Sequence, residues 1–533
     1  MHSMMKHNKR LLYLLIFLFL AGTGQAQSTL TPYFDIRSFG AIGDGKTVNT
    51  KAINDAIDAA EKGGGGTVFF PAGTYLSYSI HLKSNISLYL DQGCILMAAD
   101  STSGGQYDSP EEATNDKYQD YGHSHFHNSF IWGENLQNIS ILGPGVIYGK
   151  GLSRSFLASE GWEQKGINPG IHLKEGVANK AIALKHCRNV TLKDFTVLYG
   201  GHFGILATGV DNLTIDNIKM DTNRDGMDID CCQHVRIANC TVNSPYDDAI
   251  CLKSSYALGY ARATQNVTIT NCGVSGYDLG TFYNGTYQRK EANQVPDQEG
   301  PCGRIKFGTE SNGGFKNITI SNCVFEYCRG LALETVDGAL LEDITITNLT
   351  MRDVTNSPIF LRLGARMRGP EGTPVGALRR LIISNINAYN ADSHFASIIS
   401  GLAGHDIEAI QLNNIHIEYR PIDSPATAIQ TLVPEYEKAY PEPHKFGVLP
   451  AYGFFIRHAK NIVLNNIEIN YLGKETRPAF VMNDVKEADL FHVNVKKTPD
   501  APTFVLQNVE AITIDGNSTV KNQKIDKALQ LKL

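Results

Sequence analysis

The sequence predicts an all-β protein, a parallel β-helix that forms one long domain with a helical cap at its N-terminal end. Three observations lead to this prediction: a short pattern recurs along most of the chain, its copies alternate polar and β-branched residues as strands do, and one corner of every copy carries Asn or Asp. The six clearest copies are residues 189–197, 212–220, 234–242, 266–274, 317–325 and 343–351.

Two places within the repeat predict how each coil turns and what it buries. The sixth place holds Asp194, Asn217, Asn239, Asn271, Asn322 or Asn348, residues that tolerate the left-handed backbone of a tight turn. The seventh place is apolar and holds Phe195, Ile218, Cys240, Cys272, Cys323 or Leu349. Successive coils of such a solenoid place equivalent residues about 4.8 Å apart, so functional side chains are expected in columns.

The first residues predict a secretory signal peptide, residues 1–26. Three basic residues precede an apolar stretch at 11–20 that is too short to span a membrane, and Ala26 ends a segment typical of a cleavage site. We therefore expect a secreted or periplasmic protein. Residues 27–533 are expected to form a single domain, because a solenoid lengthens by adding coils.

A helical pattern at residues 49–61 is expected to cover the open end of the first coil, which would otherwise expose its core and unpaired backbone. Glycines at 63–66 end that helix. Residues 100–128, 255–300 and 367–376 read as loops that could form walls over a groove. The Lys-rich segment after Gly516 is expected to lack regular structure.

Charge and cysteine content exclude several classes of protein. The 48 basic and 54 acidic residues give a net charge of −6 without a basic block, so nucleic acid and anionic membranes are poor partners. Of the ten cysteines, Cys240, Cys272 and Cys323 occupy an apolar place and are predicted to be buried thiols. Bridges from Cys323 to Cys328, or from Cys302 to a neighbour, remain open at this stage.

A column of acidic residues is the main functional signal. Counting five residues past three consecutive copies gives His202, Asp225 and Asp247, with Asp248 beside the last. Clustered carboxylates push one another's pKa values apart, so one can donate a proton while another accepts one from water. Hydrolysis of a glycosidic bond needs that division of labour. The alternative is that these aspartates are turn residues that only tolerate strained backbone. Three aligned carboxylates argue against it, because stacking like charges is costly without a functional reason.

These residues also carry a resemblance. The stretches 223–228 (Asn-Arg-Asp-Gly-Met-Asp) and 246–254 resemble the paired signatures of glycoside hydrolase family 28, the polygalacturonase and rhamnogalacturonase family of pectin hydrolases. Residues 34–45 and 307–314 are similar to that family too. The resemblance implies a right-handed β-helix and inverting hydrolysis without a metal or cofactor. It implies that Asp247 is the general acid and that Asp225 and Asp248 activate water.

Two departures from the family pattern bear on the substrate. The stretch 300–303 lacks the family's Gly-His-Gly, and His202 could replace the missing histidine. In the stretch 329–335, Ala332 and Glu334 stand where the family has an Arg and a Lys that hold a galacturonate carboxylate. A neutral sugar such as rhamnose at that subsite, and a substrate other than homogalacturonan, are therefore predicted.

Five residues are predicted to bind substrate: His202, Lys253, Glu310, Glu334 and Arg362. Alignment of two neighbouring coils sets Glu334 against Arg362, which predicts an ion pair; a shared sugar-binding pair is the alternative. Arg366 and Arg368, in the next loop, could instead bind a uronate from a new direction.

Aromatic and histidine side chains give weaker signals. His123, His125 and His127 alternate and would share one face of a strand, but no convergent carboxylate supports a metal site there. Trp132 and Tyr246 are candidates for stacking on sugars, with core packing as the alternative for Trp132.

The predicted function is that of an inverting glycoside hydrolase acting on a pectic polysaccharide or its oligosaccharides, with a rhamnogalacturonan-type substrate favoured and exo action indicated by the long loops. The first alternative is a polygalacturonase or exo-galacturonosidase with a relocated uronate-binding site. A β-helix polysaccharide lyase and a noncatalytic carbohydrate-binding solenoid are the others, and neither needs Asp225, Asp247 and Asp248 together.

Overall fold

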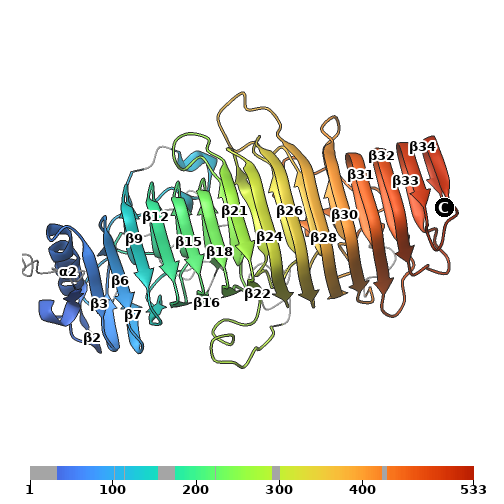
Figure 1. Ribbon diagram of the computed structural model, residues 1–533. Helices are drawn as coiled ribbons and strands as arrows, with labels where there is room; N and C mark the ends of the chain where they lie inside the picture. The colour runs from blue at the N-terminus through green and yellow to red at the C-terminus, as the bar shows by residue number, and fades with distance from the viewer. Residues whose placement is uncertain are drawn as a thin grey trace, which may run out of the picture.

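The computed structural model describes residues 33–100, 102–112, 115–153, 175–222, 224–290, 301–422 and 429–533, and it shows the predicted parallel β-helix (Figure 1). As far as β22, the coils build three stacks of separate strands, and neighbouring strands within a stack pair in parallel; from β24 onward a single long strand continues the second and third stacks together. The predicted signal peptide lies outside the described residues. Within them, no helix is long and apolar enough to cross a membrane.

Stack 1 carries the residues that the sequence marks as functional. It runs through β5 (Ile80–His81), β8 (Ile131–Glu134), β11 (Lys180–Lys185), β14 (Phe203–Thr208), β17 (Asp225–Asp230), β20 (Ile250–Ser254), β23 (Ile305–Ser311), β25 (Leu331–Thr335), β27 (Ile359–Leu363) and β29 (Ser397–Ser400).

Stacks 2 and 3 complete the wall of the coil. Stack 2 runs through β1 (Tyr33–Asp35), β3 (Gly66–Phe70), β6 (Ile86–Leu90), β9 (Gln137–Leu142), β12 (Arg188–Lys193), β15 (Asp211–Asp216), β18 (Gln233–Ala238), β21 (Thr264–Thr270), β24 (Phe315–Glu326), β26 (Leu340–Arg352), β28 (Ala377–Ala391) and β30 (Ile407–Tyr419). Stack 3 runs through β2 (Asp44–Val48), β4 (Gly73–Ser77), β7 (Cys94–Ala98), β10 (Val146–Tyr148), β13 (Thr196–Leu198), β16 (Lys219–Asp221), β19 (Thr241–Asn243) and β22 (Gly273–Ser275). The long strands β31 (Phe454–Tyr471), β32 (Phe480–Val495) and β33 (Phe504–Asp515) span the last coils.

The repeat places behave as predicted. All six residues at the sixth place have left-handed backbone, with φ between 53° at Asn217 and 71° at Asp194. All six at the seventh place are buried inside the coil. Side-chain amides at the corners also bond from coil to coil, as when Asn217 Nδ2 donates to Asp194 Oδ1 at 2.8 Å. The corner residues therefore set both the turn and the stacking of the coils.

This role of the corner predicts a stability difference at Asn217. Asn217→Ala should destabilise the protein by about 1–2 kcal/mol, because a Cβ without a local hydrogen bond is unfavourable in left-handed backbone. Asn217→Gly, which adopts that backbone freely, should lose less. Chemical denaturation of both variants measures the difference, and equal stability of the two would exclude the backbone explanation.

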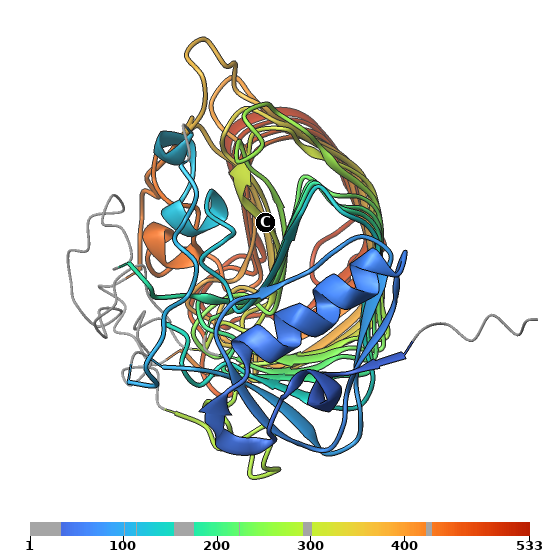
Figure 2. The ribbon, with the colours of Figure 1, turned by 90° about the vertical axis from the view of Figure 1, so that its left-hand side faces the viewer.

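Both ends of the coil are covered. The helix α2 (Thr50–Lys62) follows the short 3₁₀ helix η2 (Ile36–Phe39) and lies across the N-terminal end, with Ile53 and Ile57 buried against the first coils, as predicted (Figure 2). At the other end the sequence-based expectation was wrong. The strand β34 (Gln523–Lys532) pairs antiparallel with β33 and closes the last sheet edge, which would otherwise expose unpaired backbone.

Two segments pack on the outer face of stack 1. The first, residues 115–130, contains the 3₁₀ helices η3 (Asp116–Tyr118) and η4 (Tyr121–His123) and buries Phe126 against Phe203. The second, residues 429–453, contains η8 (Pro443–Phe446) and buries Phe446 against Phe360. Figure 2 shows both outside the same face of the coil. The predicted excursion over 255–300 is interrupted, because β21 and β22 return to the coil within it.

The cysteines are all buried and none forms a disulfide bond. Cys240, Cys272 and Cys323 occupy the interior of successive coils, as predicted for small hydrophobic residues. Cys302, Cys323 and Cys328, whose pairing the sequence left open, are free thiols.

Candidate functional site

The strand register places the aspartates one residue away from the predicted column. Phe203 pairs with Asp225, and the pairing of Met227 with Ile250 sets Asp225 beside Asp248. By the same register, His202, Arg224 and Asp247 form the adjacent column. The error arose because the turn before β20 is one residue longer than the turn before β17, which equal counting from the repeat cannot detect. The three predicted aspartates nevertheless lie together.

Asp248 is held ionised by two buried cations. Its Oδ1 accepts from Arg304 Nε at 2.8 Å, and its Oδ2 lies 3.3 Å from Lys306 Nζ. Burial opposes ionisation of Asp248, but Lys306 and Arg304 outweigh it and hold the pKa of this carboxyl well below its usual range. Asp248 is therefore ionised in the free protein and can orient a water.

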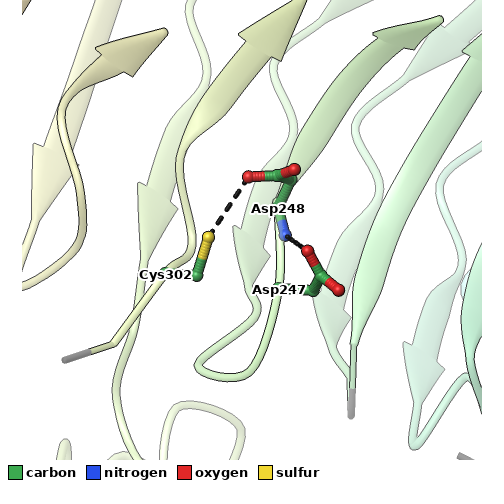
Figure 3. A group of neighbouring side chains, drawn as sticks. All are labelled: Asp247, Asp248 and Cys302. Carbon is green, nitrogen blue, oxygen red and sulfur yellow. Dashed lines mark hydrogen bonds between the residues drawn. The ribbon is translucent and has the colours of Figure 1, made fainter. Parts of the chain in front are cut away.

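Cys302 lies beside the two adjacent aspartates (Figure 3). Its Sγ donates to Asp248 Oδ1 at 3.2 Å, and burial raises the pKa of this thiol well above its usual value. The ligand atoms of Asp247, Asp248 and Cys302 lie within 4.8 Å of one another, a spacing that could hold a metal ion. The donor set does not fit one, because the thiol stays protonated and Asp248 is already neutralised by two cations.

Asp225 and Asp247 have contrasting surroundings. A hydrogen-bonded ion pair joins Asp247 to Arg224, and Asp247 Oδ1 accepts from the backbone N–H of Asp248 at 3.0 Å. The Asp247 side chain is 22% exposed, so it can meet a ligand from solvent. Burial, followed by the charges of Asp228 and Asp247, raises the pKa of Asp225 well above its usual value. The cluster thus combines Asp225, whose pKa is raised, with Asp248, whose pKa is lowered.

A second network adjoins the aspartates on the same face. Lys253 Nζ lies 3.1 Å from Glu310 Oε2 and 3.8 Å from Asp228 Oδ2. His123, from η4, bonds to Asp228 Oδ2 at 3.0 Å. Burial opposes ionisation of Glu310, but Lys253 and His123 help to hold its pKa well below normal. Lys253 and Glu310 are almost wholly buried, and in the free protein they face each other instead of solvent.

The predicted ion pair between Glu334 and Arg362 is wrong, although their register is as predicted. Arg362 instead donates to Ser400 Oγ at 2.8 Å and to the carbonyl oxygen of Glu435 at 2.7 Å, because the 429–453 segment brings its carbonyl groups over the guanidinium. Glu334 lies 3.7 Å from Lys306 Nζ, and burial raises its pKa to about 7. The described residues offer no hydrogen-bond partner to either of its carboxyl oxygens.

The histidines do not form a metal site. His123, His125 and His127 lie in η4 and the turn after it, and each faces a different carboxylate: Asp228, Asp116 and Glu134. His202 contacts the Arg224 guanidinium, with 2.9 Å from Nδ1 to Nη1. It therefore lies behind the arginine that binds Asp247.

The remaining candidates have structural contacts of their own. Trp132 stacks on His127 and donates to Asp108 at 2.8 Å, and Tyr246 is buried with its hydroxyl 3.2 Å from Lys290 Nζ. Arg366 pairs with Asp337, and Arg368 Nη2 lies 3.1 Å from Asp120 Oδ1.

Sequence reasoning missed several residues of the site. Arg304 and Lys306 alternate at the start of β23 and so face the same side, which could have been noticed. Tyr440 and Glu442 come from the 429–453 segment: Tyr440 bonds to Lys306 at 3.1 Å, and Glu442 pairs with Arg304 and with Arg329. The interruption of the repeat between Tyr419 and Phe454 was the available signal.

Fold and site together define the class: a parallel β-helix protein with an acidic cluster on the outer face of one stack. Two family models match the chain: one described as rhamnogalacturonase A/epimerase, pectate lyase-like, over residues 33–205, and one described as right handed beta helix region, over residues 175–294.

Curated relatives carry names of the same kind. A probable polygalacturonase of Vitis vinifera is 27% identical over 327 residues, which are 56% of this chain and 60% of that protein. An exo-poly-alpha-D-galacturonosidase of Dickeya chrysanthemi is 26% identical over 393 residues, 61% of this chain and 62% of that protein. The chain thus spans about three fifths of the length of these two relatives.

Solved structures agree on the fold. A family 28 exopolygalacturonase of Yersinia enterocolitica superposes with a TM-score of 0.63 at 20% identity, covering 86% of this chain and 78% of that one. The exopolygalacturonase of Thermotoga maritima gives a TM-score of 0.51 at 17% identity, covering 94% and 95%. The right-handed β-helix and the resemblance to glycoside hydrolase family 28 are thereby confirmed.

Proposed function

We propose that this protein is an inverting glycoside hydrolase that cleaves a glycosidic bond in a pectic polysaccharide or oligosaccharide. The observation that carries the proposal is the clustering of Asp225, Asp247 and Asp248, with opposite pKa directions at Asp225 and Asp248. The names of the relatives, polygalacturonase and exo-poly-alpha-D-galacturonosidase, support a pectic substrate. We further propose export by the predicted signal peptide, which a pectic substrate outside the cell would require.

In this mechanism the ionised Asp248 orients the attacking water and draws its proton, while an acid protonates the oxygen of the leaving sugar. The family resemblance assigns that acid to Asp247, which is also the most exposed of the three carboxylates. The raised pKa of Asp225 favours a proton on the Asp225 carboxyl, close to Asp247. Arg224 binds Asp247 in the free protein, so substrate must weaken that pair if Asp247 is to donate.

We propose a substrate of the rhamnogalacturonan type, with a neutral sugar near β25. Ala332 packs in the apolar cluster beneath the 429–453 segment, and Glu334 is buried. Neither side chain carries a positive charge that could bind a uronate. Arg304, Lys306 and Arg329 are each paired with a carboxylate already. The match of residues 33–205 to a model described as rhamnogalacturonase A/epimerase supports the same choice.

A side-by-side measurement tests the substrate. Rhamnogalacturonan-derived oligosaccharides should be cleaved at least tenfold more efficiently than trigalacturonate, the ratio given by about 1.4 kcal/mol of transition-state preference. Catalytic efficiency on purified oligosaccharides of matched length measures this ratio. Trigalacturonate as the best substrate would instead favour a galacturonosidase whose uronate site has moved.

Exo action is supported by a contact between two outer segments. Arg368, from the loop after β27, binds Asp120, which lies between η3 and η4, and Arg368 also lies 3.8 Å from Glu310. This bridge crosses the face of stack 1 beside the Lys253 network, where it would obstruct a continuous polymer. Early products of a single size are expected from a long substrate, and Arg368→Ala should broaden that distribution; a broad early mixture from the unaltered enzyme would show endo action.

A further inference from the structure

A second hollow lies away from the aspartates. A cavity of about 570 Å³ opens where β11 and β14 end and where β12 and β15 begin. Its lining includes Gln137, His186, Arg188, Asp211, Tyr260 and Arg262. His202 and Asp225 lie at the starts of β14 and its neighbour β17, whereas the cavity lies at the ends of β11 and β14. A strand of six residues separates the two places, so the cavity lies about 20 Å from the acidic cluster.

The lining combines an uncovered aromatic ring with several groups that donate hydrogen bonds. Tyr260, in the loop after β20, is 50% exposed. Arg188 donates from Nε to Gln137 Oε1 at 2.9 Å. Within the described residues, no carboxylate pairs with Arg188. An exposed ring beside amides and a guanidinium is the combination that recognises a sugar's apolar face and its polar substituents together.

The charges around the cavity favour an anion. Arg262 is neutralised by Asp211, with 2.8 Å between Nη2 and Oδ1, and Lys185 is neutralised by Glu134. Burial and the charge of Lys185 lower the pKa of His186, so its ring is neutral and can donate or accept one hydrogen bond. Arg188 remains as the uncompensated charge, and a planar guanidinium binds a carboxylate with two parallel hydrogen bonds.

We propose that this cavity is a second, noncatalytic binding site for a uronate-bearing segment of the pectic chain. The ring of Tyr260 stacks on one sugar, and Arg188 binds the carboxylate of a galacturonate. Such a site would hold the polymer to the enzyme while the acidic cluster acts on another segment of it, which raises the effective concentration of cleavable bonds. The identity of the chain rests on the proposed function, whereas uronate binding does not require hydrolysis.

Affinity electrophoresis through a gel containing polygalacturonate tests the site without depending on catalysis. The Asp247→Asn protein is used, so that the polygalacturonate in the gel is not hydrolysed during the run. Adding Arg188→Gln or Tyr260→Ala to this protein should weaken binding about threefold to tenfold, and added salt should reproduce the loss for the arginine contact. Tyr389→Ala removes a ring of similar exposure from β28 and serves as the matched control.

Four outcomes separate the possibilities. Loss of retardation in both cavity variants, but not in Tyr389→Ala, supports the site even if no pectic substrate is hydrolysed. Unchanged retardation of both cavity variants in the polygalacturonate gel overturns the proposed site. The proposal is also overturned if a neutral galactan gel retards the protein equally and Arg188→Gln does not alter that retardation. Cleavage of a trisaccharide by the single variants Arg188→Gln and Tyr260→Ala should match that of the unaltered enzyme, since the cavity does not contact the aspartates; a loss there would mean a folding defect.

Discussion

We expect Asp247→Asn to lower kcat/KM on a pectic oligosaccharide about 10²–10⁴-fold, which is the usual contribution of a general acid. The amide keeps the size of the carboxyl and can still accept from the backbone N–H of Asp248, so the fold should be retained. Purified variant and unaltered enzyme are compared on the same oligosaccharide, with thermal unfolding as the check on folding. Hydrolysis near the normal rate would remove Asp247 from the acid role.

A substrate with a good leaving group then distinguishes Asp247 from Asp225. A leaving group that needs no protonation bypasses the acid, so the variant of the true acid should lose little activity on it, whereas the variant of a residue that orients water should stay impaired. Asp225→Asn is the matched comparison, because burial and the neighbouring carboxylates raise the pKa of Asp225. Selective recovery in Asp225→Asn would transfer the acid role to that residue.

Arg304→Met should destabilise the protein by about 3–5 kcal/mol, the cost of removing one partner from a buried ion-pair network. Arg304 is almost wholly buried and binds both Asp248 and Glu442. Its loss removes the cation between these two buried carboxylates and leaves each with a single cationic partner, Lys306 or Arg329. It also releases the contact that joins the 429–453 segment to β23. Denaturant unfolding measures the free energy of unfolding, with activity followed in parallel.

Arg379→Met is the control for this prediction. Arg379 pairs with Glu342 at 2.9 Å on the outer side of β28, where its side chain is 34% exposed. Its loss should cost about 0–1 kcal/mol, because water stabilises the partly exposed Arg379 guanidinium and Arg380 still binds Glu342 at 2.6 Å. Similar losses in the two variants would mean that the Arg304 network is no more than a surface feature.

Much of the fold could be predicted because the determinants of a β-helix are local. An Asn or Asp at a fixed corner selects left-handed backbone, and the residue after it must be apolar because it enters the coil; Asn217 and Ile218 show both. The helix at the N-terminal end follows from the need to cover the first coil. These requirements recur in every coil, so a single sequence contains many copies of the evidence.

The site was predicted less completely because it depends on relations between distant segments. The turn before β20 is one residue longer than the turn before β17, and that residue moves Asp248, instead of Asp247, beside Asp225. The pairing of Glu334 with Arg362 failed because carbonyl groups of the 429–453 segment compete for the guanidinium. Nothing in the local pattern at β25 or β27 indicates that segment, which begins nearly 30 residues after β29 ends.

The most direct test of the central claim is the configuration of the sugar released when one bond is cleaved. Proton NMR of the first product, recorded before the anomers equilibrate in water, should show a reducing end whose configuration is inverted relative to the cleaved linkage, with no unsaturated uronate and no rise in ultraviolet absorbance. That result is expected if Asp225, Asp247 and Asp248 deliver one water and one proton to the bond. The retained anomer, or an unsaturated product formed by elimination, would contradict the account.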